Sequence, residues 1–386
     1  MRKITLAGLT LLAALNGGLA DAAGGKPRAR DLGVPFDGTP GPQNAITDVK
    51  GVEVGHSTII KGEGKLVVGQ GPVRTGVTAI LPRGKASTDP VFGGFFSLNG
   101  NGEMTGTTWL EESGFLDGPV MITNTHSVGV VRDAVIEWRV KKGSPDASGY
   151  WWSLPVVAET WDGLLNDVNG FHVKPAHAFE ALDSARGGPV PEGSVGGGTG
   201  MVCNEFKGGI GTSSRVLPAA AFGYTVGVLV QCNCGVRPNL LIAGVPVGKE
   251  IPEEPAYRQE TGSIIIVVAT DAPLLAHQVK RLARRASLGL ARTGSISGNG
   301  SGDIFVAFST ANPGAAREDK GPRSLTMLPN DSMNGLFGAT VEATEEAIVN
   351  AMVAAETMVG RDSHRVIGLP HDRLRAVLKK YNRLKE

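Results

Sequence analysis

The stretch "RQETGSIIIVVATDAP", residues 258–273, decides the fold, because it joins a strand to the start of a helix. Its run from Ile264 to Val268 is apolar and β-branched, which is typical of a strand buried on both faces. Asp271 and Pro273 then form a helix start signal. Apolar residues recur at helical spacing from Leu275 to Leu290, so we predict a buried strand followed by an amphipathic helix.

Ser263 opens this strand and directly follows Gly262. It can be a polar residue at an exposed strand end, or a nucleophile released by cleavage of the Gly262–Ser263 bond. An α-amino group has a pKa of about 7.7 to 8.0, so a serine at a new N-terminus carries its own base. Glycine also lets the hydroxyl approach the preceding carbonyl. The dipeptide alone is not specific, since it recurs at 143–144, 193–194, 294–295 and 300–301.

The rest of the chain predicts one α+β domain with packed sheets and covering helices. Short apolar segments between glycine-bearing turns predict strands at 76–82, 119–123 and 223–233. Helical spacing predicts a helix from Thr340 that stops at Gly360, and another from His371 to the end. The Gly/Pro-rich segment 24–48 is interpreted as an extended arm that wraps the domain.

Composition and charge exclude several classes of protein. The chain has 386 residues, of which 41% are hydrophobic, enough for a substantial core. Its net charge of +1 gives no indication of nucleic acid or an anionic membrane as a partner. Arg2 and Lys3, the apolar run 4–15 and the small residues 20–22 predict a secretory signal, residues 1–22. We therefore expect an exported protein, periplasmic or secreted, whose apolar run is too short to span a bilayer.

The three cysteines are Cys203, Cys232 and Cys234. A bridge between Cys232 and Cys234 would be strained, because one residue separates them at a strand end. No further cysteine or histidine follows at the spacing of a metal site. We therefore expect buried free thiols and no metal site at these cysteines. An organic cofactor is not expected either.

Other familiar signatures do not fit. The stretch "GGGTG" at 196–200 lacks the strand, helix and acidic residue of a dinucleotide site. The chain contains no Gly-x-Ser-x-Gly elbow and no His-Glu-x-x-His helix, which argues against the common esterases and zinc peptidases. The seven histidines form no cluster in sequence, and His126 in "TNTHSVG" is the least easily dismissed.

Long motifs resemble a known family. They include "TGSIIIVVATDAPLLAHQVKRLARRASLGLARTGSISGNGSGDIFVAFSTAN", "GSVGGGTGMVCNEFKGGIGTSSRVL", "YTVGVLVQCNCG" and "RARDLGVPFDGTPGPQNAITDVKGVEVGH". They resemble the self-processing serine aminopeptidases, which include the L-aminopeptidase/D-esterases and the β-peptidyl aminopeptidases. The resemblance covers essentially the whole mature chain. It implies a four-layer αββα sandwich that is similar in architecture to the N-terminal-nucleophile hydrolases but differs in connectivity.

The resemblance also implies self-cleavage. The inactive precursor would be cut between Gly262 and Ser263 into an α-subunit, residues 23–262, and a β-subunit, residues 263–386, which stay together. Ser263 matches the family nucleophile, and its freed amine would act as the base. Relatives of this kind form homotetramers, so a homo-oligomer is expected.

The resemblance assigns further site residues. Ser301 and Asp303, in "GNGSGD", match the hydroxyl and acidic positions that support the amine, although some relatives carry Glu in place of Asp303. A turn serine and a strand-capping aspartate are the alternative. Asn233, in "VQCNCG", matches the amide that stabilises the oxyanion, while Cys234 beside it departs from the family pattern.

Substrate choice is predicted from "VVAETWDG". Glu159 aligns with the carboxylate that binds the substrate amine in the β-peptidyl members, unless it is a structural salt-bridge residue. Trp161, placed by strand alternation on the same side, would form an apolar wall. Small peptides or amino-acid amides are the expected substrates, and β-amino-acid residues are favoured. Alternatives are α-amino amides or D-residue esters, acetyl transfer of the ornithine acetyltransferase type, and an inactive binding protein.

Overall fold

The computed structural model describes residues 26–143, 152–257, 262–317 and 321–386. The predicted secretory signal lies outside these residues. Within them, no helix is long and apolar enough to cross a membrane.

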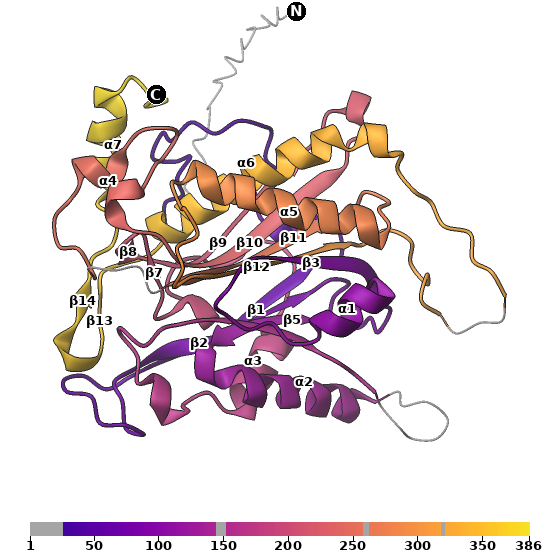
Figure 1. The fold of residues 1–386 in the computed structure, drawn as a ribbon, viewed down its shortest axis with the longest axis horizontal. Coiled ribbons are helices and arrows are strands. Elements are labelled where there is room, and N and C mark those ends of the chain that lie inside the picture. Colours follow the sequence, from indigo (N-terminus) through magenta and orange to yellow (C-terminus); the bar gives the residue numbers. More distant parts are fainter. Residues whose placement is uncertain (1–25, 144–151, 258–261, 318–320) are drawn as a thin grey trace, which may run out of the picture.

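Two β-sheets form the centre of the molecule (Figure 1). The four-stranded sheet has the order β1-β2-β5-β6, with β1 at Glu53–Lys61, β2 at Val73–Leu81, β5 at Val120–Asn124 and β6 at Val156–Thr160. The six-stranded sheet has the order β4-β3-β12-β11-β10-β9. Its strands are β3 at Val91–Gly100, β4 at Phe115–Leu116, β9 at Gly209–Val216, β10 at Thr225–Asn233, β11 at Ser263–Thr270 and β12 at Gly302–Ser309.

Helices cover the outer face of each sheet (Figure 1). Helices α5 (Ala276–Arg292) and α6 (Asn334–Val353) lie on the six-stranded sheet, and α2 (Val128–Lys142) and α3 (Pro175–Ser184) lie on the four-stranded one. The four layers therefore follow the order helix, sheet, sheet, helix. This confirms the predicted αββα sandwich.

The smaller elements lie around these layers. They are α1 at Thr107–Ser113, α4 at Val247–Glu250 and α7 at His371–Lys380, with the two-stranded pairs β7 (Val202–Cys203) with β8 (Phe206–Lys207) and β13 (Met358–Val359) with β14 (Arg365–Val366).

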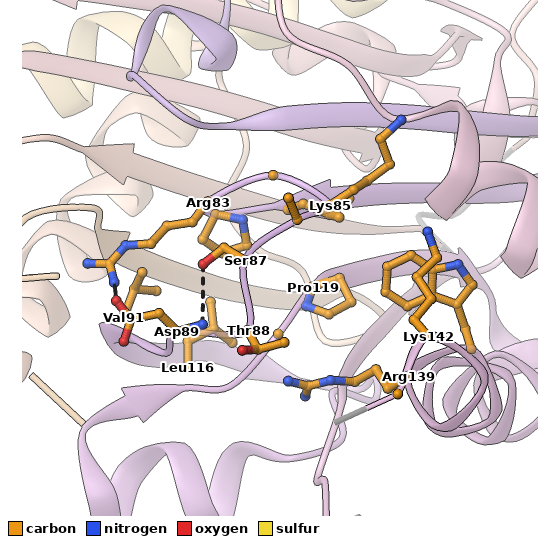
Figure 2. Close-up of a pocket in the computed structure, with 17 residues that line it drawn as sticks. Arg83, Lys85, Ser87, Thr88, Asp89, Val91, Leu116, Pro119, Arg139 and Lys142 are labelled. Carbon is orange, nitrogen blue, oxygen red and sulfur yellow. Dashed lines mark hydrogen bonds and ion pairs between the residues drawn. The ribbon is translucent and has the colours of Figure 1, made fainter. Parts of the chain in front are cut away.

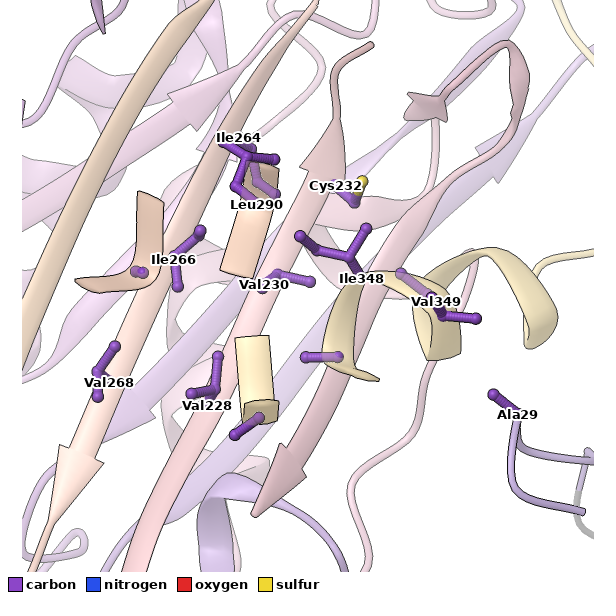
Figure 3. Packing of buried hydrophobic residues seen from close by; sticks show 14 of the residues in the cluster. Ala29, Val228, Val230, Cys232, Ile264, Ile266, Val268, Leu290, Ile348 and Val349 are labelled. Atoms are coloured by element: carbon purple, nitrogen blue, oxygen red, sulfur yellow. The ribbon is translucent and has the colours of Figure 1, made fainter. Parts of the chain in front are cut away.

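Strand β11 is the centre of the core, and all eight of its residues are buried. Ile264, Ile266 and Val268 pack in the layer of α5 and α6, which Figure 3 shows beside Val228 and Val230 of β10. The alternate residues 265, 267 and 269 face the four-stranded sheet. Both faces are therefore covered by apolar side chains, which explains the uninterrupted β-branched run. By the same alternation, the side chain of Ser263 is directed into the layer between the sheets.

The predicted strands and helices are found with shifted ends. The largest shift is at α6, which runs from Asn334 to Val353, whereas the predicted helix ran from Thr340 to Gly360. The helix starts earlier because Leu336 and Ala339 in its first turns already face the core. Gly360 lies beyond β13, where a methyl group would come within 2.2 Å of the Leu165 carbonyl oxygen. This glycine therefore permits a close approach and does not end the helix.

The N-terminal arm, predicted from its composition to wrap the domain, lies against α6 on the six-stranded half of the molecule. The backbone N–H of Ala29 donates to Oδ1 of Asn350 in α6, at 3.0 Å. Arg30 forms two 2.8 Å contacts with the buried carboxylate of Glu346. A bidentate pair of this kind fixes both position and orientation. The arm is thereby tied to the helix that covers β9 and β10.

The expectation of free thiols was wrong for two of the three cysteines. Cys203 in β7 and Cys232 in β10 form a disulfide, with their Cα atoms 5.5 Å apart. Cys234 is buried beside them and is not part of this bond. The pair was missed because 29 residues separate the two cysteines, and only the fold brings β7 next to the end of β10.

Candidate active site

Ser263 lies at the first position of β11, where three strands meet. In the antiparallel pair with β10 its register partner is Asn233, and the parallel strand β12 begins alongside at Gly302. The backbone N–H of Gly302 donates to Oγ of Ser263 at 3.0 Å. Ser263 is 4% exposed, so the residue is almost fully buried.

Gly262 precedes the hydroxyl in a position that admits only glycine. A methyl group there would lie 1.6 Å from the carbonyl oxygen of Asn233 and 3.2 Å from the Cα atom of Cys234. Both are backbone atoms, so they cannot move aside as a flexible side chain could. The backbone at Gly262, next to the bond with Ser263, is therefore in close contact with the backbone at the end of β10.

Ser301 and Asp303 form a hydrogen-bonded pair at the start of β12. Oγ of Ser301 donates to Oδ1 of Asp303 at 2.6 Å, and both side chains are fully buried. Burial raises the pKa of Asp303, while the polar groups of Ser301, Ser297 and the Ile264 backbone offset part of that rise. Asp303 pairs in register with Ile264, so its carboxyl group lies next to the backbone of the residue that follows Ser263.

The side chain of Asn233 is held on both sides. Its Oδ1 accepts from the backbone N–H of Val202 at 2.7 Å, and its Nδ2 donates to the carbonyl oxygen of Trp161 at 2.8 Å. A primary amide has two N–H groups on this nitrogen, so one remains for another acceptor. Because Asn233 is the register partner of Ser263, that N–H lies at the end of β10 nearest the hydroxyl.

Two ionisable groups are buried behind this amide. Burial raises the pKa of Asp162, which follows Trp161 in the chain, to about 7, although Thr75, Asn166 and Asn124 offset part of the rise. Burial also lowers the pKa of Lys207 to about 7. The Lys207 ammonium donates to three carbonyl oxygens of its own segment, those of Gly198, Met201 and Gly208.

Glu159 lies near the end of β6 and is 3% exposed. Its Oε1 accepts from the backbone N–H of Glu103 at 3.0 Å, and its Oε2 accepts from Oγ1 of Thr125 at 2.5 Å. Burial raises the pKa of Glu159, and the nearby Glu103 carboxylate adds to the rise, while both hydrogen bonds offset part of it. The group is therefore a hydrogen-bonded carboxylate for which the described residues provide no ion pair.

A chain of close contacts joins this carboxylate to the serine. A methyl group at Gly102 would lie 3.3 Å from Oε1 of Glu159 and 3.2 Å from the Cα atom of Gly302. Gly302 is the residue whose N–H binds the hydroxyl of Ser263. The two glycines thus allow the loop after β3 to pass between the carboxylate and the start of β12.

The predicted position of Trp161 was partly wrong. Strand β6 ends at Thr160, so strand alternation does not extend to the tryptophan. Trp161 opens the following loop, where its indole packs on Gly163. It lines a cavity of about 340 Å³ together with Leu66, His126 and Arg361. It therefore forms a wall next to the site and also positions Asn233 through its carbonyl group.

Sequence reasoning missed the residue that holds Glu159. His126 in "TNTHSVG" was singled out as the histidine least easily dismissed, without a link to Glu159, whose hydrogen bond comes from Thr125, one residue earlier. The ring of His126 instead stacks on Phe171, with centroids 6.1 Å apart. The motif was a usable signal, but nothing in its spacing indicated which side chain faces the carboxylate.

A second cavity, of about 380 Å³, contains none of the predicted site residues (Figure 2). It lies near Val91 at the start of β3, whereas Gly302 pairs with Gly100 at the other end, on the order of 30 Å away along the strand. Its cationic side chains have acceptors: Arg83 pairs with Asp89, and Lys142 with Asp183. We therefore place the active site at the Ser263 end of the sheet.

Solved structures with the same architecture define the class. The structure of the L-aminopeptidase D-Ala-esterase/amidase from Ochrobactrum anthropi is described as a prototype of the serine aminopeptidases and a variant of the Ntn hydrolase fold. It matches with a TM-score of 0.87 and 50% identity, over 93% of this chain and 100% of that one. A β-aminopeptidase from Burkholderia sp. matches with a TM-score of 0.84 and 50% identity, over 92% and 99%. The fold and the buried serine site are thus those of a serine peptidase.

The chain belongs to peptidase family S58, whose family model matches residues 44–366. It is also 57% identical over 384 residues to the β-peptidyl aminopeptidase BapA of Sphingosinicella microcystinivorans, covering 95% of each chain. The BapA of Sphingosinicella xenopeptidilytica is 50% identical, covering 96% of each.

Proposed function

We propose that the protein is a self-processing aminopeptidase that releases N-terminal β-amino acids from small peptides and amides through an acyl-enzyme on Ser263. The similarity to two β-peptidyl aminopeptidases supports the substrate class. The observation that carries the proposal is the placement of the buried Glu159 carboxylate one glycine contact away from Gly302, which binds the Ser263 hydroxyl. The carboxylate for the substrate ammonium and the nucleophile for its carbonyl group thus lie on either side of one short loop.

Activation begins with the serine attacking the bond that precedes it. Oγ of Ser263 adds to the carbonyl carbon of Gly262, the peptide C–N bond breaks, and the acyl group moves to oxygen as an ester. Water then hydrolyses the ester and leaves a carboxylate on Gly262. The freed nitrogen of Ser263 takes up a proton as an amine. The close packing of Gly262 on the Asn233 carbonyl group supports this step, because it restricts the backbone that directly precedes the hydroxyl.

The freed amine then serves as the base for substrate hydrolysis. It accepts the Oγ proton as Oγ attacks the substrate carbonyl carbon, and it returns a proton to the leaving amine. The remaining N–H of Asn233 stabilises the oxyanion, and Asp303 stabilises the ammonium form of the base. Water releases the amino acid from the ester by the same route in reverse. Asp303 is suited to this role because its carboxyl group lies beside the backbone of Ile264.

Glu159 supplies the selectivity for a free amine. A buried carboxylate that accepts hydrogen bonds from the neutral N–H of Glu103 and hydroxyl of Thr125 gains a charge-assisted hydrogen bond when an ammonium binds. In a β-amino-acid residue the amine lies one carbon further from the scissile carbonyl than in an α-residue. A difference of one methylene group between two substrates changes kcat/KM by roughly 10- to 200-fold in a well-formed pocket.

The test combines chain analysis with substrate comparison. The purified protein should give two chains of about 25 and 13 kDa, scaled by length from 40.1 kDa, and the smaller should begin Ser-Ile-Ile-Ile. It should hydrolyse a β-alanyl anilide at least roughly tenfold better, in kcat/KM, than the L-alanyl and D-alanyl anilides. Preference for an α-amino substrate would instead favour the L-aminopeptidase/D-esterase activity. An uncut chain that is fully active would contradict the mechanism.

The pH dependence should reveal the Glu159 carboxylate. Its pKa is raised, so it becomes protonated at a higher pH than an ordinary glutamate and then loses the charge that holds the ammonium. We expect kcat/KM to fall first as the Ser263 amine is protonated. A second, steeper fall should follow at lower pH as Glu159 is protonated, with a midpoint above pH 4.5, the unperturbed pKa of glutamate. Because the Glu103 carboxylate contributes to the rise, Glu103→Gln should move the midpoint to lower pH. A midpoint that does not move would contradict this assignment.

We also propose that the mature enzyme is exported and forms a homotetramer. The charged, apolar and small-residue segments of the first 22 residues support export. Fractionation of cells that express the full chain, followed by light scattering of the purified protein, would test both.

A further inference from the structure

The N–H group proposed to stabilise the oxyanion depends on a small structural unit outside the main sheets. The Asn233 side chain is fixed by the backbone N–H of Val202 and the carbonyl group of Trp161. Val202 lies in β7, which pairs with β8 in a small two-stranded sheet separate from the two main sheets. A shift of β7 would therefore rotate the Asn233 amide even if β10 and β11 remained in place.

A covalent bond joins the two sides of this hydrogen bond. Cys203 directly follows Val202, and Cys232 directly precedes Asn233, so their disulfide brackets the contact between Val202 and Asn233. Both cysteines are fully buried. The next residues are also joined, because the backbone N–H of Asn204 donates to the carbonyl group of Cys234 at 2.7 Å.

The rest of the β7–β8 unit is arranged to hold β7 in this position. A methyl group at Gly208 would lie 2.4 Å from the carbonyl oxygen of Cys232 and 2.8 Å from Cβ of Cys203, so the turn packs directly on the disulfide. The buried ammonium of Lys207 ties together the carbonyl groups of Gly198, Met201 and Gly208. The unit is thus internally tied, and the disulfide is its covalent link to β10.

We propose that the Cys203–Cys232 disulfide is a positioning element of the active site, which fixes the Asn233 amide for oxyanion stabilisation. The inference rests on the proposed function, because it assigns that role to Asn233. Without the disulfide, β7 is held to the end of β10 by hydrogen bonds alone, those from Val202 to Asn233 and from Asn204 to Cys234, and the amide samples orientations that do not stabilise the oxyanion. Glu159 is in neither segment, so ground-state binding of the substrate amine is unaffected.

The experiment compares the paired variant Cys203→Ala/Cys232→Ala with the control Cys234→Ala. Both are assayed as processed two-chain enzyme on a β-alanyl anilide. We expect the paired variant to lose about tenfold to a hundredfold in kcat with KM unchanged, and the control to keep its kcat. Unchanged kcat in the paired variant, or a loss that appears only in KM, would overturn the proposal.

A second comparison separates positioning from a general loss of stability. In an Asn233→Ala background the amide is already absent, so removing the disulfide should cause no further fall in kcat. A further fall equal to that in the wild type would assign the disulfide a merely structural role. If Asn233→Ala alone leaves kcat unchanged, the oxyanion assignment fails, which is a different outcome from failure of the disulfide proposal.

Peptide mapping keeps the proposal falsifiable if the paired variant does not fold. Digestion of the alkylated wild-type enzyme without reductant should recover a cross-linked peptide that contains Cys203 and Cys232. Recovery of both residues as alkylated thiols from active enzyme would overturn the proposal.

Discussion

The Ser263→Ala variant should remain a single uncut chain and show no hydrolysis of any aminoacyl anilide. Alanine has no lone pair with which to attack the Gly262 carbonyl, so neither the ester nor the free amine can form. The fold should persist, because the side chain of Ser263 makes a single hydrogen bond with the described residues, accepted from the N–H of Gly302, and the backbone pairing with β10 is kept. Leaving that donor unpaired costs about 1–3 kcal/mol, which a domain of this size tolerates.

A matched control is available at Ser301. Ser301→Ala removes the 2.6 Å hydrogen bond to Asp303 but leaves the nucleophile and the cleavage site intact. We expect self-cleavage that is slower but proceeds to completion. The kcat should fall by about tenfold to a hundredfold, no more than the low end of what general-base catalysis contributes, because the base itself is kept. Gel analysis over time and steady-state kinetics measure both effects. If the Ser263→Ala variant were still cleaved into two chains and active, Ser263 could not be the nucleophile.

The Glu159→Gln variant should process normally and yet hydrolyse β-aminoacyl anilides poorly. Glutamine keeps the shape of the side chain but removes the negative charge that the substrate ammonium requires. A hydrogen bond to a charged group is worth about 1.5–3 kcal/mol, so kcat/KM should fall by roughly 10- to 150-fold, with most of the loss in KM. Self-cleavage needs no substrate amine, so the two-chain pattern should be unchanged.

Glu103→Gln provides the control for charge. Glu103 is exposed, and it contacts Glu159 through its backbone N–H, which the substitution keeps. At neutral pH this variant should retain wild-type kcat/KM. If Glu103→Gln and Glu159→Gln lose activity equally, the loss comes from the lower negative charge near the site and not from a specific contact of Glu159. If neither does, Glu159 does not bind the amine.

More of the fold than of the site geometry could be predicted from the sequence. The β-branched run of β11 and the helical spacing of α5 were clear, because both elements are long and their burial is uniform. The ends of α6 were missed because its apolar residues extend beyond the segment that shows the strongest periodicity. Such ends depend on what covers the helix, which local sequence does not contain.

The site residues were named through family motifs, but their contacts were not predictable. Nothing in the spacing of Asn233 and Ser263 indicates that they are register partners in adjacent strands. The Thr125 contact with Glu159 and the disulfide partner of Cys232 likewise join segments that are distant in sequence. These contacts arise from the stacking of two sheets, so only the assembled fold reveals them.

The strand order has a consequence for the cleaved enzyme. Strands β11 and β12, downstream of the proposed cut, lie between β10 on one side and β3 on the other, both from upstream of it. Strands from the two fragments therefore alternate within one sheet, and backbone hydrogen bonds join the fragments on both sides of the β12–β11 pair. Dilution cannot separate them, since parting them means melting the central sheet. The proposed cut would thus release a terminus without creating a dissociable heterodimer.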